Sequence, residues 1–228
     1  MKPTIEITKD GSSTLVHPKY QAHYHSIYGA IEESNHVYIN AGLLYFLSSE
    51  KRQDILQSCS ILELGFGSGL NAFNTLLKTE ALPVNINYLG IETDPVPIDV
   101  IKKLNYPELL QANEKQELFD NMHTVSWEDV HQITSSFSLE KRQLDIFKLE
   151  ADNQFDLVYF DAFGPGAQPE LWTEPIFKIM YRALKKGGVL ITYCSQGAAR
   201  RAMISVGFTV SRLPGPPNKR HILRAVKE

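Results

Sequence analysis

The chain has 228 residues, 43% of them hydrophobic, so it can bury one substantial core and favours a single α/β domain. No apolar run approaches the roughly 18 residues that a membrane span needs, and the first residues lack the features of a secretion signal. We therefore expect a cytoplasmic protein that makes no membrane contact. Cys59 and Cys194 form no Cys-x-x-Cys pair, which indicates two buried thiols.

The net charge of −3 conceals an asymmetry along the chain. Residues 176–228 contain 11 Lys or Arg and one acid. The whole chain has 23 basic and 26 acidic residues, so residues 1–175 contain 12 basic and 25 acidic ones. The net charge is therefore −13 for residues 1–175 and +10 for residues 176–228. The basic part favours a polyanionic partner such as RNA or DNA, although solvated helix faces would have the same composition.

The first 50 residues differ from the rest in their pattern of apolar and polar residues. Short β-like pieces such as His36–Ile39 stand between polar turns. We therefore predict a β-rich extension over residues 1–50, packed on a catalytic domain over residues 51–228.

From Ile55 onward, buried strands and amphipathic helices alternate. The predicted strands are Ser60–Leu64, Ile86–Glu92, Phe137–Leu139, Phe155–Asp161, Val189–Cys194, Phe208–Leu213 and His221–Val226. The predicted helices are Leu70–Lys78, a segment that begins near Pro97, the stretch from Glu174 to the pair Gly187 and Gly188, and Gly197–Val206. This order implies a doubly wound α/β sheet, seven-stranded and mostly parallel, with the last two strands antiparallel at one edge. It resembles the Rossmann-like class I methyltransferase fold.

The stretch LELGFGSGLN places three glycines in five positions at a strand-to-helix turn, where open α/β sheets bind ligands. No Gly-Lys-Ser/Thr follows, which excludes a triphosphate loop, and the spacing is not Gly-x-Gly-x-x-Gly. An acid before the glycines would repel a pyrophosphate but would suit the cationic groups of S-adenosylmethionine. Tight packing of the helix on the strand would also require glycines. The residues assigned to the cofactor here are Glu63, Gly65, Gly67, Gly69 and Asn71.

Two further acids follow later strands. Glu92 lies 23 residues after Gly69, near the offset at which an acid meets ribose hydroxyls, and Asp94 is the alternative for that role. Either of them could instead cap the following helix. Asp145 could accept a hydrogen bond from the adenine amino group or be a solvent-exposed acid. Together these positions favour an adenosyl ligand.

The stretch YFDAFGPGAQPELWT contains the candidate catalytic residue. Asp161 ends an apolar strand, so its carboxylate is expected in the crevice at the edge of the sheet. Methyl transfer to an amine requires a neutral nitrogen, and a carboxylate beside the methyl donor could take the proton. Phe163, Trp172 and Tyr193 could offer faces to a nucleobase, although Trp172 and Tyr193 could equally be core aromatics.

Four motifs together carry a family resemblance: LELGFGSGLN, YFDAFGPGAQPELWT, TYCSQGAARRAMISVGF and LPGPPNKRHILRAVKE. They resemble the tRNA 5-methylaminomethyl-2-thiouridine methyltransferases, which are the methyltransferase half of the bifunctional MnmC enzymes or the stand-alone MnmD form. Residues 24–43 resemble the entry segment of that family. The likeness covers nearly the whole chain except roughly residues 98–135.

The resemblance implies S-adenosylmethionine as methyl donor and the aminomethyl nitrogen of a tRNA wobble uridine as acceptor, with Asp161 near that nitrogen. It also implies phosphate contacts from two basic pairs. The chain departs from the family at His221, where Glu is usual, and at Gln196, where Lys is frequent. The basic pairs are Arg200 with Arg201, and Lys219 with Arg220.

Because the chain ends at Glu228, we expect methylation without the flavin-dependent oxidase reaction, and a separate enzyme that supplies the aminomethyl uridine. The alternatives are an aminopropyltransferase of the spermidine synthase type and a small-molecule N-methyltransferase. A polyamine acceptor favours an acidic cleft, which the basic carboxyl-terminal part argues against. A metal site at His23, His25 and His36 would lack a fourth ligand, so we expect no metal.

Overall fold

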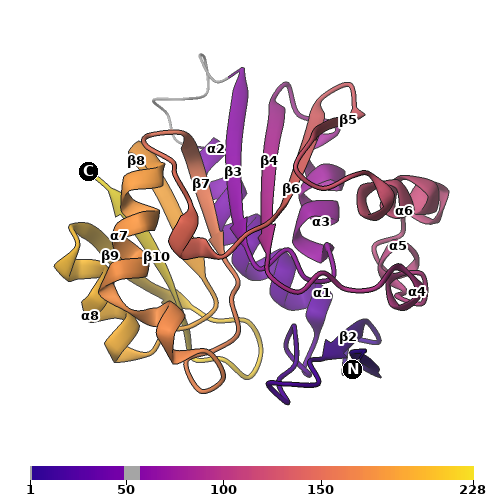
Figure 1. Cartoon of the computed structure of the whole chain (residues 1–228), viewed down its shortest axis with the longest axis horizontal. Helices are drawn as coiled ribbons and strands as arrows, with labels where there is room; N and C mark the ends of the chain where they lie inside the picture. Colours follow the sequence, from indigo (N-terminus) through magenta and orange to yellow (C-terminus); the bar gives the residue numbers. More distant parts are fainter. Residues whose placement is uncertain (1, 49–56) are drawn as a thin grey trace.

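The computed structural model describes residues 2–48 and 57–228, and a mixed β-sheet runs through its centre (Figure 1). The seven predicted strands are present as β3 (Ser58–Leu64), β4 (Asn85–Glu92), β6 (Phe137–Gln143), β7 (Phe155–Phe160), β8 (Leu184–Thr192), β9 (Phe208–Pro214) and β10 (His221–Lys227). An unpredicted strand, β5 (Val130–Thr134), brings this sheet to eight strands within the described residues, in the order β5-β6-β4-β3-β7-β8-β10-β9. The central strands β6, β4, β3, β7 and β8 are parallel, and β5, β10 and β9 are antiparallel at the edges. The predicted mostly parallel sheet is confirmed.

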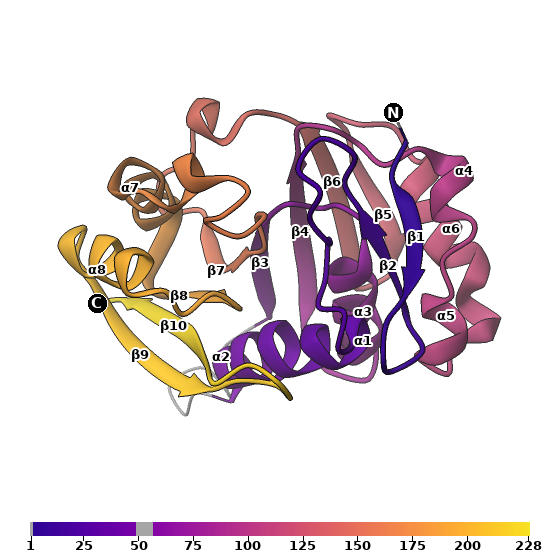
Figure 2. The ribbon, with the colours of Figure 1, turned by 90° about the horizontal axis from the view of Figure 1, so that it is seen from below.

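Alternating residues of the central strands face two packed layers (Figure 2). Leu157 and Tyr159 of β7 face one layer, and Val158 and Phe160 face the other. Because both faces are covered, all six residues of β7 are buried. The first layer contains the helices α3 (Leu70–Thr79) and α6 (Gln116–Thr124), and the second contains α7 (Glu174–Ala183) and α8 (Gly197–Ser205).

The amino-terminal segment consists of a two-stranded β-ribbon followed by a helical run. Strands β1 (Thr4–Ile7) and β2 (Ser13–Val16) pair antiparallel, in agreement with predicted β structure there. The prediction of β structure at His36–Ile39 was wrong, because this stretch lies inside a helical run. The run consists of α1 (Ala30–Glu33), the π-helix η1 (Ser34–Leu44) and α2 (Tyr45–Leu47). Val37, Tyr38 and Ile39 of this run are buried in the core, and this packing overrides their local preference for a strand.

The helix predicted to end at the glycine pair 187–188 ends earlier. Helix α7 ends at Ala183, and the chain continues directly into β8. The pairing of β7 with β8 shifts register between Phe155 and Leu157, and Gly187 there has φ +74°. The glycines therefore accommodate an irregularity inside a strand rather than the end of a helix.

The segment predicted near Pro97 is a chain of short elements. These are α4 (Ile98–Ile101), α5 (Tyr106–Leu109) and the 3₁₀ turn η2 (Asn113–Lys115), which lead to α6. Two more 3₁₀ turns, η3 (Ile146–Lys148) and η4 (Pro169–Trp172), follow β6 and β7.

Three remaining expectations concern the chain as a whole. The predicted boundary between residues 50 and 51 lies outside the described residues. Within the described ranges, the longest apolar helical stretches fall short of what a bilayer crossing requires. Cys59 and Cys194 are both buried, as predicted.

Gly42 tests how tightly the amino-terminal helical run packs on the sheet. A Cβ at this position would lie 2.9 Å from Ile191 Cγ2 of β8. We expect Gly42→Ala to lower the free energy of unfolding by about 1–3 kcal/mol, because overpacking outweighs the higher helix propensity of alanine. Gly166→Ala is the matched control, since nothing lies within 4 Å of its added Cβ. Equal free energies of unfolding in urea for the two variants would contradict this packing.

Candidate active site

A cavity of about 320 Å³ opens at the carboxyl ends of β3, β4 and β7. The loop after β2, at residues 17–25, lines one side of it, and the β1–β2 ribbon lies at the same edge of the sheet (Figures 1 and 2). This edge is the usual ligand position in doubly wound sheets. The amino-terminal segment and the sheet therefore build the cavity together.

The glycine-rich turn forms the floor of the cavity. The backbone N–H groups of Gly65 and Phe66 donate to the Ile91 carbonyl at 2.9 and 3.0 Å, which fixes the turn against β4. Gly65 has φ +91°, and a Cβ there would lie 2.7 Å from the Asp161 carbonyl oxygen. Gly65 and Gly67 line the cavity. Gly69 instead precedes α3 against His123, outside the lining, so packing of the helix accounts for this glycine.

Glu92 lines the cavity and accepts hydrogen bonds from two loops, the glycine-rich turn after β3 and the loop after β4. Its Oε2 accepts from the Gly67 N–H at 3.1 Å, and its Oε1 accepts from the N–H groups of Thr93 and Asp94 at 2.8 and 3.1 Å. Burial raises the pKa of Glu92. Asp94, the alternative, lines the same cavity but has a largely exposed side chain, 3.4 Å from His17 Nε2. Glu92 is therefore the organised carboxylate at the end of β4.

Asp145 lies on the cavity wall that the segment after β6 forms beside Glu92. Its Oδ1 accepts from the Phe147 N–H at 3.0 Å and so caps the turn η3. Ile146 and Phe147 line the cavity beside it, and the Phe147 side chain is exposed. This wall joins an apolar surface to a hydrogen-bonding carboxylate.

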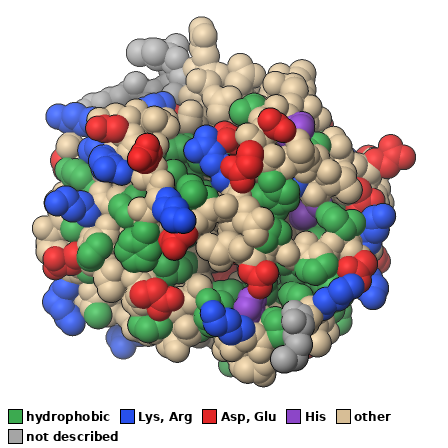
Figure 3. Space-filling view, in the orientation of Figure 1, with side chains coloured by type: hydrophobic (Ala, Val, Ile, Leu, Met, Phe, Trp, Pro, Cys, Tyr) green, Lys and Arg blue, Asp and Glu red, His purple; other side chains and the backbone are tan. Residues whose placement is uncertain are grey.

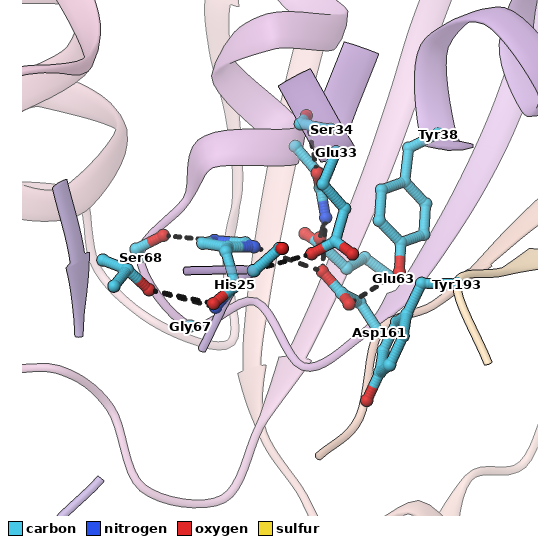
Figure 4. Close-up of polar contacts among 12 residues, drawn as sticks. His25, Glu33, Ser34, Tyr38, Glu63, Gly67, Ser68, Asp161 and Tyr193 are labelled. Carbon is cyan, nitrogen blue, oxygen red and sulfur yellow. Dashed lines mark hydrogen bonds and ion pairs between the residues drawn. The ribbon is translucent and has the colours of Figure 1, made fainter. Parts of the chain in front are cut away.

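Asp161 lies directly after β7, at the inner end of the cavity (Figure 4). Its Oδ1 accepts from the Tyr38 hydroxyl at 2.6 Å, and its Oδ2 accepts from the Asn71 side-chain amide at 2.8 Å. The side chain is 5% exposed. Burial raises the pKa of Asp161 to about 8 and exceeds the opposing effect of the two hydrogen bonds. The carboxyl group can thus gain or lose a proton near neutral pH.

Glu63 and Asn71 lie behind Asp161 rather than in the cavity lining. The Asn71 amide nitrogen also donates to Glu63 Oε1 at 2.9 Å, and the Tyr88 hydroxyl donates to Glu63 Oε2 at 2.8 Å. Burial raises the pKa of Glu63 well above its usual range. These contacts assign both side chains a supporting place beneath Asp161, and direct contact with the cofactor stays a prediction.

His25 is a cavity residue that the sequence analysis considered only as a metal ligand. Its Nε2 lies 2.9 Å from the Ser68 hydroxyl, and its Nδ1 lies 3.9 Å from Asp161 Oδ2 (Figure 4). Burial lowers the pKa of His25 to about 4, so the ring is neutral at pH 7. The Tyr106 hydroxyl donates to the same Ser68 oxygen at 3.2 Å, so Ser68 joins His25 to the amino-terminal end of α5.

The other two histidines of the rejected metal site lie elsewhere. His23 Nε2 is 2.9 Å from Glu6 Oε2, and His36 Nε2 is 2.9 Å from the Pro214 carbonyl. Among residues 2–48 and 57–228, the His, Cys, Asp and Glu side chains form no group of three or more that could hold a metal.

The predicted aromatic residues have different positions. Phe163 lines the cavity and makes edge contacts with Tyr24 and His17, at centroid distances of 5.0 and 5.4 Å. Trp172 is buried against Phe160, and its Nε1 donates to the Phe163 carbonyl at 2.8 Å. The Tyr193 hydroxyl donates to the Ala162 carbonyl at 2.9 Å. Of these three predicted aromatics, Phe163 lines the cavity, whereas Trp172 and Tyr193 support its loop.

The four predicted basic residues differ in exposure and in their partners. Arg201 on α8 and Arg220 after β9 are exposed, whereas Arg200 is half-buried and its Nε has no hydrogen-bond partner among the described residues. Lys219 is half-buried and forms an ion pair with Glu33 of α1. The sequence resemblance therefore located four cations, of which Lys219 contacts a carboxylate inside the protein.

Comparison with known proteins decides the class of this site. Residues 114–228 match a family model described as S-adenosyl-L-methionine-dependent methyltransferase. The chain belongs to this family. S-adenosylmethionine is accordingly its cofactor, and the glycine-rich turn and the acid after β4 fit that ligand.

Curated proteins with similar sequences point to one group of methyltransferases. The tRNA 5-methylaminomethyl-2-thiouridine biosynthesis bifunctional protein MnmC of Paraburkholderia phytofirmans is 27% identical over 97% of this chain and 34% of its own length. The MnmC protein of Polaromonas naphthalenivorans is 28% identical over 98% and 36%. This methyltransferase chain thus spans about a third of the length of the curated relatives it matches.

Solved structures show the same fold. MNMC2 from Aquifex aeolicus has a TM-score of 0.72 and is 25% identical, over 98% of this chain and 70% of that one. Spermidine synthase from Thermotoga maritima has a TM-score of 0.57 at 17% identity, over 100% and 70%. The likeness to spermidine synthase is one of fold alone.

The sequence analysis missed the inward-facing residues of the amino-terminal helical run. It noted that residues 24–43 resemble the entry segment of a methyltransferase family but, apart from the metal site it rejected, weighed no role for residues there. The structure brings His25, Glu33 and Tyr38 from that segment to Asp161. The family resemblance of the segment was the one signal that could have located them.

Glu92 provides a direct test of the cofactor site. We expect Glu92→Gln to weaken the binding of S-adenosylmethionine about 10–100-fold, because a charged acceptor of several hydrogen bonds is lost. Asp94→Asn, the matched control at the exposed neighbouring acid, should change the affinity by less than about twofold. Calorimetry measures both, and equal losses would contradict the assignment of Glu92.

Proposed function

We propose that this methyltransferase acts on the aminomethyl nitrogen of a tRNA wobble uridine and converts 5-aminomethyl-2-thiouridine to 5-methylaminomethyl-2-thiouridine. The single observation that carries the proposal is the position of the Asp161 carboxyl, which is buried at the inner end of the cofactor cavity and accepts hydrogen bonds from Tyr38 and Asn71. The names of the MnmC relatives supply the identity of the acceptor.

The lining of the cavity suggests how the cofactor binds. The backbone of Gly65 and Gly67 would lie under its methionine portion, Glu92 would accept from the ribose hydroxyls, and Asp145 would accept from the adenine amino group. Apolar side chains of η3 would cover the adenine ring. When bound, S-adenosylmethionine supplies an electrophilic methyl group on a sulfonium.

Asp161 would remove the proton that blocks the acceptor nitrogen. An alkylamine has a pKa of about 10, so at neutral pH it arrives mostly as ammonium and has no lone pair for attack. A carboxylate with a pKa near 8 is a suitable general base for that proton. The hydrogen bonds from Tyr38 and Asn71 would hold the carboxylate in position for this proton transfer.

The aromatic rim would hold the uracil ring. Phe163, Tyr20, Tyr24 and His17 meet around the cavity at centroid distances of 4.6–6.0 Å. Aromatic faces bind unstacked bases without needing a base-specific pattern of hydrogen bonds. Water excluded from this rim would strengthen the interaction of Asp161 with the amine.

The tRNA backbone would contact exposed cations near the same edge of the sheet. Arg201 and Arg220 are both exposed and follow β8 and β9. The reaction also requires an aminomethyl group already attached to the uridine, so a separate preceding reaction has to supply it.

Replacement of Asp161 tests the proposed base. In single-turnover reactions on tRNA that carries aminomethyl uridine, the wild-type rate should rise with pH and level off above about pH 8, as Asp161 loses its proton. Asp161→Asn should lower the rate about 10²–10⁴-fold and remove this pH dependence. Calorimetry should show that cofactor binding is retained. A variant with wild-type rates would remove Asp161 from the mechanism.

Replacement of Arg201 tests the proposed RNA surface. Arg201→Ala should weaken tRNA binding and reduce the slope of log affinity against log salt by about 1, as expected for one lost phosphate contact. Lys186→Ala is the control, because this exposed lysine lies in the amino-terminal half of β8, away from the cavity edge. An unchanged slope for Arg201→Ala would locate the RNA surface elsewhere.

A further inference from the structure

An ion pair joins two distant parts of the chain beside Asp161. Lys219, in the turn between β9 and β10, contacts Glu33 at the end of α1, 186 positions away. The Glu33 side chain is 5% exposed and that of Lys219 is 28% exposed. Figure 4 shows Glu33 next to Asp161 and Tyr193. The pair therefore lies beside Asp161, behind the residues that line the cavity.

Backbone contacts of the turn direct Lys219 inward. The Lys219 N–H donates to the Pro216 carbonyl at 2.9 Å, and the Gly215 N–H donates to the Arg220 carbonyl at 3.3 Å. The Pro214 carbonyl lies 2.9 Å from His36 Nε2, so the turn is also attached to the π-helix. These contacts fix Lys219 toward α1 rather than toward solvent.

Lys219 is surrounded by groups that its charge affects. The ammonium lies over the Tyr193 ring, 4.1 Å from the centroid, and the Tyr193 hydroxyl donates to the Ala162 carbonyl at 2.9 Å. Besides Glu33, the titratable groups that face this region include Tyr38, Asp161, His25, Tyr193 and Cys194. Lys219 lowers the pKa of Asp161, and Glu33 raises it.

We propose that Lys219 and Glu33 are a positioning charge pair of the acceptor site, and that their balance sets how readily Asp161 and the bound amine lose their protons. The amine is the acceptor of the proposed function, and the effect on Asp161 does not depend on it. A cation near an arriving ammonium favours release of its proton, because like charges repel. Glu33 holds Lys219 in place and keeps it from neutralising Asp161 directly.

The pairing argues against a phosphate contact for Lys219. A lysine that turned outward to RNA would leave Glu33 buried with its charge uncompensated, which is strongly unfavourable. Arg220, the next residue, is exposed and needs no such rearrangement. The two members of this basic pair therefore have different roles.

The test is a titration of the Asp161 carboxyl by carbon-13 NMR in the whole protein, with Asp161→Asn used to assign the signal. Lys219→Met should raise the pKa of Asp161 by about one unit, and Glu33→Gln should lower it by a similar amount. The double variant should return toward the wild-type value. Lys186→Met, an exposed lysine outside the site, should leave the value unchanged. Shifts in the same direction for both single variants, or none, would overturn the inference.

Methylation rates give a second readout that separates this inference from the proposed function. On tRNA that carries aminomethyl uridine, the acidic limb of kcat/KM should move up in pH for Lys219→Met and down for Glu33→Gln. Lys219→Arg should restore the wild-type limb. A reduced salt slope for tRNA binding with an unmoved limb in Lys219→Met would show a phosphate contact and overturn the inference. Absence of methylation by the wild-type enzyme would contradict the proposed function, while the titration would still test the pair.

Discussion

The site depends on keeping one carboxyl group, that of Asp161, buried and hydrogen-bonded. A buried carboxylate is costly unless polar partners surround it. Its partners come from separate parts of the chain: Tyr38 from the amino-terminal helical run and Asn71 from α3. Asn71 in turn holds Glu63 of β3. The amino-terminal segment is therefore a wall of the reaction site, and the sheet without it would leave Asp161 open to water.

The π-helix gives the amino-terminal segment its particular geometry. Ser34 and Tyr38 lie about one turn apart in η1, and both project to the same side. The Ser34 hydroxyl donates to Asn71 Oδ1 at 2.8 Å, so one turn of η1 fixes both hydrogen-bond partners of the Asp161 network. Such π segments are frequent at functional sites, because their wider turn changes which residues share a face. Gly42 then allows the run to approach β8 closely.

The sequence predicted the strands, the glycine-rich turn and the positions of Glu92, Asp145 and Asp161, because each follows a buried strand in a local pattern. It could not predict the direction of a side chain where two directions are sterically possible. Glu63 and Trp172 stand in the right motifs but point into packed regions, which tertiary contacts decide. The error at His36–Ile39 has the same origin, since a run of β-formers is also a suitable buried helix face.

Charge composition was the weakest guide to the molecular surface. Several carboxyl-terminal cations have partners within the chain: Lys219 pairs with Glu33, Lys185 pairs with Asp156, and Arg182 donates to two backbone carbonyls. On the face in Figure 3, basic and acidic side chains are interspersed rather than separated. A net charge of +10 over residues 176–228 therefore overstates the basic surface. Because the basic surface is limited, recognition of the proposed tRNA acceptor depends mainly on the cavity. A base unstacked from a single-stranded loop can reach the aromatic rim there and the buried carboxyl behind it.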